Sequence, residues 1–172
     1  DDGQLEFASR YAYSSGKMSK DRYSSVTPGQ LNSTLSYQRM KSHAGELCAR
    51  WDEKSGWCLK GDFGLGSLGH GTLNDEDFPA FTTPYSNTTS DLSQGRTTYI
   101  NIDGGFNVLG GPGYKAGPLI GYQYWYQGIN AFGCTQTAAA VATAPCVPAI
   151  PNSQIVFTET EKWQGFRVGL NS

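Results

Sequence analysis

The most regular stretch of the sequence reads Trp57-Cys58-Leu59-Lys60-Gly61-Asp62-Phe63-Gly64-Leu65-Gly66-Ser67-Leu68. Its odd positions are mostly large and apolar, and its even positions are mostly charged or small. Successive side chains of a β-strand point to opposite faces of the sheet. The alternation therefore predicts a strand with one apolar face and one polar face.

Five further segments alternate in a similar way, and no helical period of useful length competes with them. They lie near residues 5–13, 31–51, 99–108, 114–131 and from about 162 onward. The sequence therefore predicts an all-β chain, 1–172, that is a single domain with about six antiparallel strands.

The longest of these segments, 31–51, has a charged middle at Arg39, Lys41 and His43. Its alternation places Leu35 and Tyr37 near the start on the same face as Leu47 and Trp51 near the end. We therefore expect the two apolar ends of the strand to lie on one face of the sheet.

The connections alternate in length. Two are short, at 53–56 and 110–113, and three are long and polar, at about 14–29, 69–96 and 132–160. In an up-and-down meander this order places all long loops at one end and all tight turns at the other. Outer-membrane β-barrels show this asymmetry.

Alternation alone does not say which face meets water, because a soluble lipocalin-like barrel turns its apolar face inward and a membrane barrel turns it outward. The polar face carries Glu46, Arg50, Lys60 and Asp62 in register, and a dry core would hold these charges only at a large desolvation cost. A hydrated interior holds them easily. The pattern therefore favours an antiparallel up-and-down transmembrane β-barrel, with aromatic girdles at Trp51, Trp57, Tyr114, Tyr122, Tyr124 and Tyr126.

Composition narrows the classes of function. The formal net charge is −2 and no basic run is present, which argues against nucleic-acid binding. No segment approaches the roughly 20 apolar residues of a membrane helix, and no His/Cys/Glu cluster has the spacing of metal ligands. No signal peptide is visible at Asp1-Asp2-Gly3, so we expect a mature form or an excised piece.

The four cysteines form two local pairs. Cys48 and Cys58 flank the expected 53–56 turn on the same face, where a disulfide is geometrically feasible, and Cys134 and Cys146 bracket an Ala/Thr-rich loop. Two disulfides would indicate an oxidising compartment such as the periplasm or the cell surface. The alternative is four free thiols.

Two acids, Asp75 and Asp77, lie in Leu73-Asn74-Asp75-Glu76-Asp77-Phe78, which we expect to be the loop leaving the 57–68 strand. If the extended backbone continues, both side chains leave it on the same side. Two such carboxylates do not both ionise freely, so one would hold a proton near neutral pH and could take part in activating water. The alternative is a pair of solvated acids on a polar loop.

Taken together, these residues resemble the omptin family of outer-membrane endopeptidases. The collinear matches are Ser15-Gly16-Lys17, Lys20-Asp21-Arg22-Tyr23, Gln30-Leu31, Leu73-Asn74-Asp75-Glu76-Asp77-Phe78, Asn101-Ile102-Asp103, Pro112-Gly113-Tyr114-Lys115 and Gly121-Tyr122-Gln123. The resemblance implies a ten-stranded barrel in the bacterial outer membrane, of which this chain matches the N-terminal three-fifths.

The resemblance also implies roles for individual residues. Asp75 and Asp77 match the family's first catalytic acid pair, which faces an Asp–His dyad from a later strand across a water that attacks the scissile carbonyl. That dyad is not in this chain, since His43 reads as a rim residue and His70 as a loop residue. Asp21 matches the acid that binds a basic substrate side chain.

On the lipid side, Tyr122 and Lys162 match residues that contact lipopolysaccharide, while Tyr124 and Tyr126 stand where charged residues are expected. The implied activity is cleavage of peptides or proteins near basic residues at the cell surface. Lipopolysaccharide is the implied activator and outer-membrane lipid the implied partner, with no other cofactor. The alternative function is a non-enzymatic outer-membrane barrel, an adhesin or a structural protein, that keeps the fold without proteolysis.

Overall fold

The computed structural model describes residues 3–78, 85–111, 114–138 and 144–171. The strands are β1 (Gln4–Tyr23), β2 (Leu31–Asp52), β3 (Trp57–Asp77), β4 (Ser86–Phe106), β5 (Leu109–Gly111), β6 (Tyr114–Ala138) and β7 (Ile150–Asn171). Within these residues, no helix is long and apolar enough to cross a membrane. The prediction of an all-β chain is confirmed.

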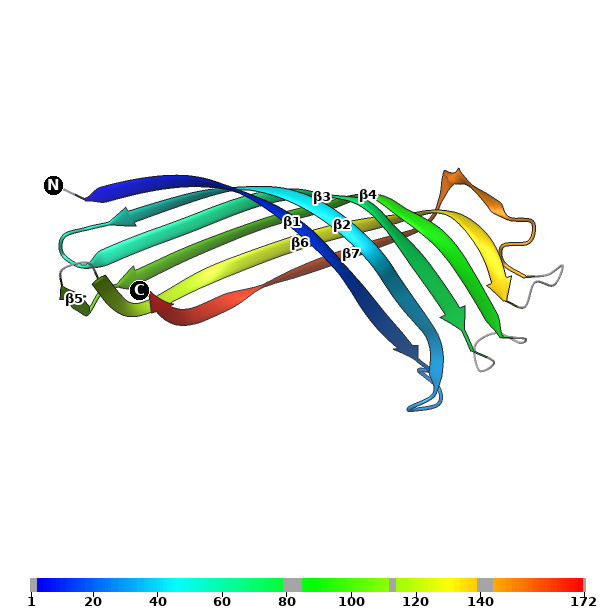
Figure 1. Cartoon of the computed structure of the whole chain (residues 1–172). Coiled ribbons are helices and arrows are strands. Elements are labelled where there is room, and N and C mark those ends of the chain that lie inside the picture. Colours follow the sequence, from blue (N-terminus) through cyan, green and yellow to red (C-terminus); the bar gives the residue numbers. More distant parts are fainter. Residues whose placement is uncertain (1–2, 79–84, 112–113, 139–143, 172) are drawn as a thin grey trace.

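The long strands form one antiparallel sheet in which neighbours in sequence are neighbours in space. The order is β1-β2-β3-β4-β6-β7, and the short β5 pairs only with the start of β6. The sheet curls into a half-barrel that is open on one side (Figure 1). Strands β1 and β7 are its two edges.

Side chains on the concave side of the sheet form the inner face. Lys20 of β1 identifies this side, because it reaches Glu159 and Glu161 of β7 and only the concave side lets one edge strand contact the other. Arg10 shares this face of β1 and pairs with Glu46, so the charged row lies inward as predicted.

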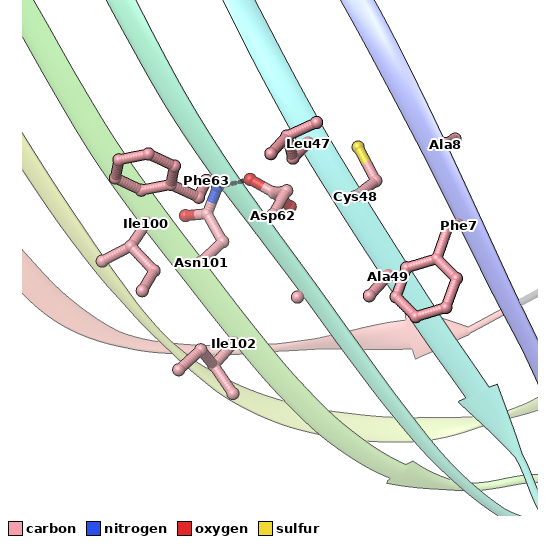
Figure 2. A pocket seen from close by; sticks show the side chains of 11 residues that line it. Phe7, Ala8, Leu47, Cys48, Ala49, Asp62, Phe63, Ile100, Asn101 and Ile102 are labelled. Carbon is pink, nitrogen blue, oxygen red and sulfur yellow. Dashed lines mark hydrogen bonds between the residues drawn. The ribbon is translucent and has the colours of Figure 1, made fainter.

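The large apolar side chains of the opposite, outer face are exposed along the half of the sheet next to the 53–56 turn, here called the turn half. Phe63 is 41% exposed, Leu65 53% and Ile100 37%. A shallow hollow of about 390 Å³ on this surface is surrounded by Phe7, Leu47, Ala49, Phe63, Ile100 and Ile102 (Figure 2). The expected orientation, apolar residues outward and charged residues inward, is present in the turn half.

A row of bulges crosses the middle of the sheet and changes this orientation. Arg39 in β2 and Gln94 in β4 both have φ of 52°, and the register shifts beside each of them. Each bulge adds one residue, so the inward positions of β2 are odd before Arg39, as at Leu35, and even after it, as at Glu46. The expectation that Tyr37 shares a face with Leu47 is therefore wrong: Tyr37 is buried on the inner face and Leu47 is 65% exposed.

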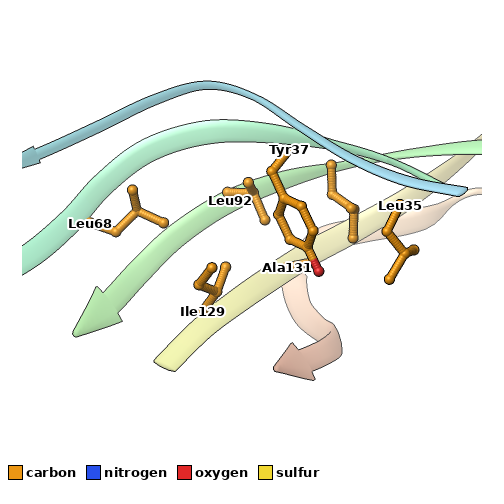
Figure 3. Packing of buried hydrophobic residues seen from close by; sticks show 7 residues of the cluster. Leu35, Tyr37, Leu68, Leu92, Ile129 and Ala131 are labelled. Carbon is orange, nitrogen blue, oxygen red and sulfur yellow. The ribbon is translucent and has the colours of Figure 1, made fainter. Parts of the chain in front are cut away.

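The change of face creates a small core inside the half-barrel, in the half nearer the 24–30, 78–85 and 139–149 connections, here called the loop half. Its buried members come from β2, β3, β4 and β6 and pack across the concave surface (Figure 3). They are Leu35, Tyr37, Leu68, Leu73, Leu92, Ile129 and Ala131. This core lies on the same concave face as Asp75 and Asp77.

The strands extend further than the alternation predicted. The three expected long loops do lie at one end, but β1, β3, β4, β6 and β7 each continue into them. The reason is that polar residues are tolerated on both faces of the loop half, so the period of two is hidden there. The short turn at 53–56 is confirmed, with Gly56 at φ of +106° and its N–H donating to Glu53 O. Of the expected 110–113 turn, residues 112–113 lie outside the described residues.

One of the two expected disulfides is present. Cys134 is bonded to Cys146 with a Cα–Cα distance of 5.6 Å. Cys48 and Cys58 are free, and the Cys48–Cys58 pairing is wrong. Both thiols are on the inner face as expected, but the hairpin register places Asp52 opposite Cys58 and Asp62 opposite Cys48. The two sulfurs are therefore in different rows of the sheet.

Candidate functional site

The acid pair, Asp75 and Asp77, lies at the loop end of β3. Both residues belong to the strand and not to the loop that follows, so the expected loop position is wrong. Because they are two residues apart on one strand, their side chains share a face, as predicted, and pairing with Leu35 and Ser33 makes it the inner face. The hydroxyl of Ser33 on β2 donates to Asp75 Oδ1 at 3.1 Å.

The surroundings of the acid pair favour its protonated form. Burial raises the pKa of Asp75, and the negative charge of Asp77 raises it further. Burial also raises the pKa of Asp77. The hydrogen bond from Ser33 and the positive charge of Arg22 oppose these shifts without cancelling them.

Arg22 was not predicted as part of the site. It lies on β1 opposite Ser33, so the cation, the hydroxyl and the acid pair come from three neighbouring strands. The sequence signal was its even position, which it shares with the inward Lys20. An acid pair that is close to a cation and a hydroxyl donor can hold a water molecule and polarise a carbonyl group.

A second polar network lies beside the acid pair on the same inner face. Lys20 donates to Glu159 Oε1 at 2.8 Å and also contacts Glu161, while the hydroxyl of Tyr37 donates to Glu159 Oε2. Burial raises the pKa of Tyr37, and the Glu159 carboxylate raises it further, so this hydroxyl stays a donor. Sequence reasoning missed these residues because their partners are far apart in the chain.

Asp21, expected to bind a basic substrate side chain, lies on the outer face. Thr34 Oγ1 donates to Asp21 Oδ1 at 2.9 Å, and Thr34 is on the face opposite to Ser33. The period of two along β1 places Lys20 and Arg22 inward and Asp21 outward. The structure therefore does not bring Asp21 together with the acid pair.

Neither histidine forms a site together with the acid pair. His43 is exposed on the outer face, and its Nδ1 hydrogen-bonds the hydroxyl of Tyr11. His70 is exposed in β3 beside the bulge, and not in a loop as expected. It precedes Asp75 by five residues, which is about 16 Å of extended strand.

The two predicted lipid contacts, Tyr122 and Lys162, share the outer face of β6 and β7. The hydroxyl of Tyr122 donates to Gln164 Oε1 at 2.8 Å. Lys162 Nζ lies 5.7 Å from the centroid of the Tyr126 ring. The structure thus places both side chains on one surface, four residues apart along β6 in the register of the sheet.

Within the described residues, no group of three or more His, Cys, Asp or Glu side chains could hold a metal ion. Comparison of the chain with protein-family models, with curated proteins and with solved structures gave no match.

Proposed function

We propose that this chain forms part of the wall of a bacterial outer-membrane β-barrel that cleaves peptides near basic residues at the cell surface. The observation that carries the proposal is the position of Asp75 and Asp77, side by side on the inner face at the loop end of β3, with Ser33 donating to one of them. The proposed chemistry depends on these two carboxyl groups.

The two faces of the turn half support a place in the membrane. Its outer face is a band of exposed apolar and aromatic side chains, whereas its inner face holds ion pairs such as Arg10–Glu46 and Arg167–Asp103. Lipid favours the first surface and a hydrated interior the second. Sheet edges cannot face lipid unpaired, so in the proposed ten-stranded barrel β1 and β7 pair with further strands.

In the proposed mechanism, the acid pair orients a water molecule for attack on the scissile carbonyl. One carboxylate accepts a hydrogen bond from the water, and the proton released in the attack passes to a base on the facing wall, where the resemblance places an Asp–His dyad. The raised pKa values of both acids favour a pair that shares one proton. The protonated carboxyl group would then donate a hydrogen bond to the developing oxyanion. Asp21 would attract a basic side chain that approaches over the rim.

The outer face of β6 and β7 supplies the proposed contact with outer-membrane lipid. Tyr122 and the ammonium group of Lys162 would bind lipopolysaccharide, through its acyl chains and its phosphate groups respectively. Lipopolysaccharide would then act as the activator.

The test is cleavage of a fluorogenic peptide containing Arg-Arg by the full-length protein in lipopolysaccharide-containing vesicles. We expect Asp75→Ala with Asp77→Ala to reduce kcat/KM at least a hundredfold, because both water-orienting groups are lost. Glu76→Gln is the matched control, since Glu76 lies between the two acids in sequence but faces outward. Unchanged cleavage in the double variant would refute the assigned chemistry.

The second candidate function is a non-enzymatic barrel whose loops bind a partner. One observation favours it: Asp21, the expected substrate-binding acid, lies on the face opposite to the acid pair. This candidate predicts that the wild-type protein does not cleave the peptide with or without lipopolysaccharide.

A further inference from the structure

Three aromatic rings form a continuous stack on the inner face, here called the aromatic shelf: Tyr99 of β4, Trp125 of β6 and Trp163 of β7. The centroids of Tyr99 and Trp125 are 5.2 Å apart with an interplanar angle of 11°, and those of Trp125 and Trp163 are 5.8 Å apart with an angle of 15°. The rings are nearly parallel and stacked, so Trp125 lies between the other two rings, and Trp163 on the edge strand keeps one face free of them.

The register of the sheet builds this shelf. Tyr99, Trp125 and Trp163 are direct cross-strand partners, and Gly64 of β3 precedes them in the same row. A Cβ at Gly64 would lie only 2.1 Å from the Tyr99 ring, so glycine is the residue that lets this ring lean over β3. The Tyr99 hydroxyl then donates to Glu46 Oε2 at 2.7 Å, which fixes the ring.

Much of the shelf remains open. Trp163 is 50% exposed although it is on the inner face, and a Cβ at the neighbouring inward residue, Gly165, would have nothing within 4 Å. A hollow of about 390 Å³ borders Tyr99 and Trp125, over a floor of small residues that includes Ala44 and Gly66. This volume is within the range of small-molecule pockets, about 300–1,000 Å³.

Neutral hydrogen-bonding groups flank the Tyr99 and Trp125 rings on both sides. Gln123 and Gln127 are the inward neighbours of Trp125 on β6, while Thr97 and Asn101 are those of Tyr99 on β4. Three carboxylates among the described residues border the shelf, and each has a partner. Glu46 pairs with Arg10, Glu161 beside Trp163 pairs with Lys20, and Asp62 accepts a hydrogen bond from Asn101. Flat apolar surfaces bordered by neutral donors and acceptors match a ligand that has apolar ring faces and hydroxyl groups around its edge.

We propose that the aromatic shelf binds a neutral oligosaccharide inside the barrel. A sugar ring would stack on the face of Trp163 that Trp125 does not cover, and hydroxyls of the oligosaccharide would hydrogen-bond Gln123 and Gln127. The shelf is separate from the acid pair, because Gly64 and Asp75 are eleven residues apart on β3, which is roughly 35 Å of strand. The proposal therefore stands whether or not the protein is a peptidase.

The experiment is titration of the full-length protein with maltohexaose and with chitohexaose, followed by intrinsic tryptophan fluorescence. The protein is held in a detergent without a sugar headgroup, because a glycoside detergent would compete for the shelf. We expect a saturable change with at least one of the two oligosaccharides. Trp163→Ala should weaken binding at least tenfold, since its half-exposed ring supplies the most open surface.

Two further variants keep the test independent of folding. Trp57→Phe removes an exposed outer-face tryptophan and should leave binding unchanged. Gly165→Leu places a side chain in open space beside Trp163, so it should retain the near-ultraviolet circular dichroism of the stacked rings while weakening binding at least tenfold. Absence of saturable binding by both oligosaccharides, equal affinity in Gly165→Leu, or tighter binding of adenosine than of either sugar would overturn the proposal.

Discussion

Lys20 on β1 donates a hydrogen bond to Glu159 on β7 at 2.8 Å, although these two strands are the opposite edges of the sheet. The side chains are 28% and 16% exposed, so water screens their attraction only in part. Glu161 also contacts Lys20. A single cation thus holds two carboxylates of the far edge close to β1 and limits how widely the half-barrel opens.

Replacing Lys20 with Met should destabilise the protein by about 1–3 kcal/mol, because two partly buried carboxylates lose their shared cation. The free energy of unfolding is measured by urea titration in detergent micelles. Lys17→Met is the matched control, since Lys17 lies on the same strand at an odd, outward position, and its effect should stay within about 0.5 kcal/mol. Equal effects of the two substitutions would contradict a structural role for Lys20.

The same contact predicts acid sensitivity. Burial alone would raise the pKa of Glu159, but the hydrogen bonds from Lys20 and Tyr37 together outweigh it and lower this pKa. A carboxyl group with a lowered pKa in the native state stabilises the protein above its unfolded value, 4.5, and this stabilisation is lost as the pH falls through the native pKa. We expect wild-type stability to fall below pH 4.5, and less steeply in Glu159→Gln. Parallel curves of stability against pH would count against this coupling.

The acid pair predicts the opposite dependence of stability on pH. Because burial and the charge of Asp77 raise the pKa of Asp75, ionised Asp75 destabilises the native state once the pH exceeds its unfolded value, 3.8. Asp75→Asn removes the charge and keeps an oxygen for the Ser33 hydroxyl. We expect this variant to unfold at higher urea than the wild type at pH 7, with the difference vanishing below pH 3.8. A variant that is less stable than wild type at pH 7 would disprove the unfavourable charge.

Stabilisation by a loss of charge would also bear on function. Groups kept at a cost to stability are concentrated at functional sites. If Asp75→Asn gains stability and loses peptide cleavage, the carboxyl group is retained for chemistry. If the variant gains stability and the wild-type protein does not cleave the peptide either, the non-enzymatic barrel is favoured.

Local alternation was sufficient to predict the turn half of the fold. From Trp57 to Leu65 the period of two gave the strand, its exposed apolar side and its charged side, and the structure has all three. The acid pair was also predictable, since two residues on one strand always share a face. These features depend only on neighbouring positions in the sequence.

Features that depend on distant residues or on one backbone angle were not predictable. Nothing in the residue types at Arg39 and Gln94 indicates a positive φ, so the change of face in β2 and β4 was missed. Lys20 and Glu159 are 139 positions apart, and only the completed sheet brings them together. Trp125 did carry a signal, because it is a large aromatic residue in the polar row between Gln123 and Gln127.

The bulge in β4 gives a direct test of the register. Gln94 has φ of 52°, a conformation that costs residues with a side chain about 1 kcal/mol relative to glycine. We expect Gln94→Gly to stabilise the protein by roughly that amount. The neighbour Ser93 is in regular strand conformation, so Ser93→Gly should destabilise it by about 0.5–1 kcal/mol. Destabilisation by both substitutions would place the bulge elsewhere.

The proposed membrane orientation is tested by moving one charge between the faces of the turn half. Phe63 points outward at 41% exposure, whereas Gln123 points inward nearby, one row along the sheet. In lipid vesicles, Phe63→Arg should destabilise the folded barrel by about 2–4 kcal/mol, because an arginine near the bilayer centre loses its hydration. Gln123→Arg should cost much less, since it enters a hydrated interior. The difference should shrink in detergent micelles, which deform more easily around a charge. If Phe63→Arg folds into vesicles as stably as Gln123→Arg, the outer face does not meet lipid, and the curled sheet must cover that apolar surface with protein.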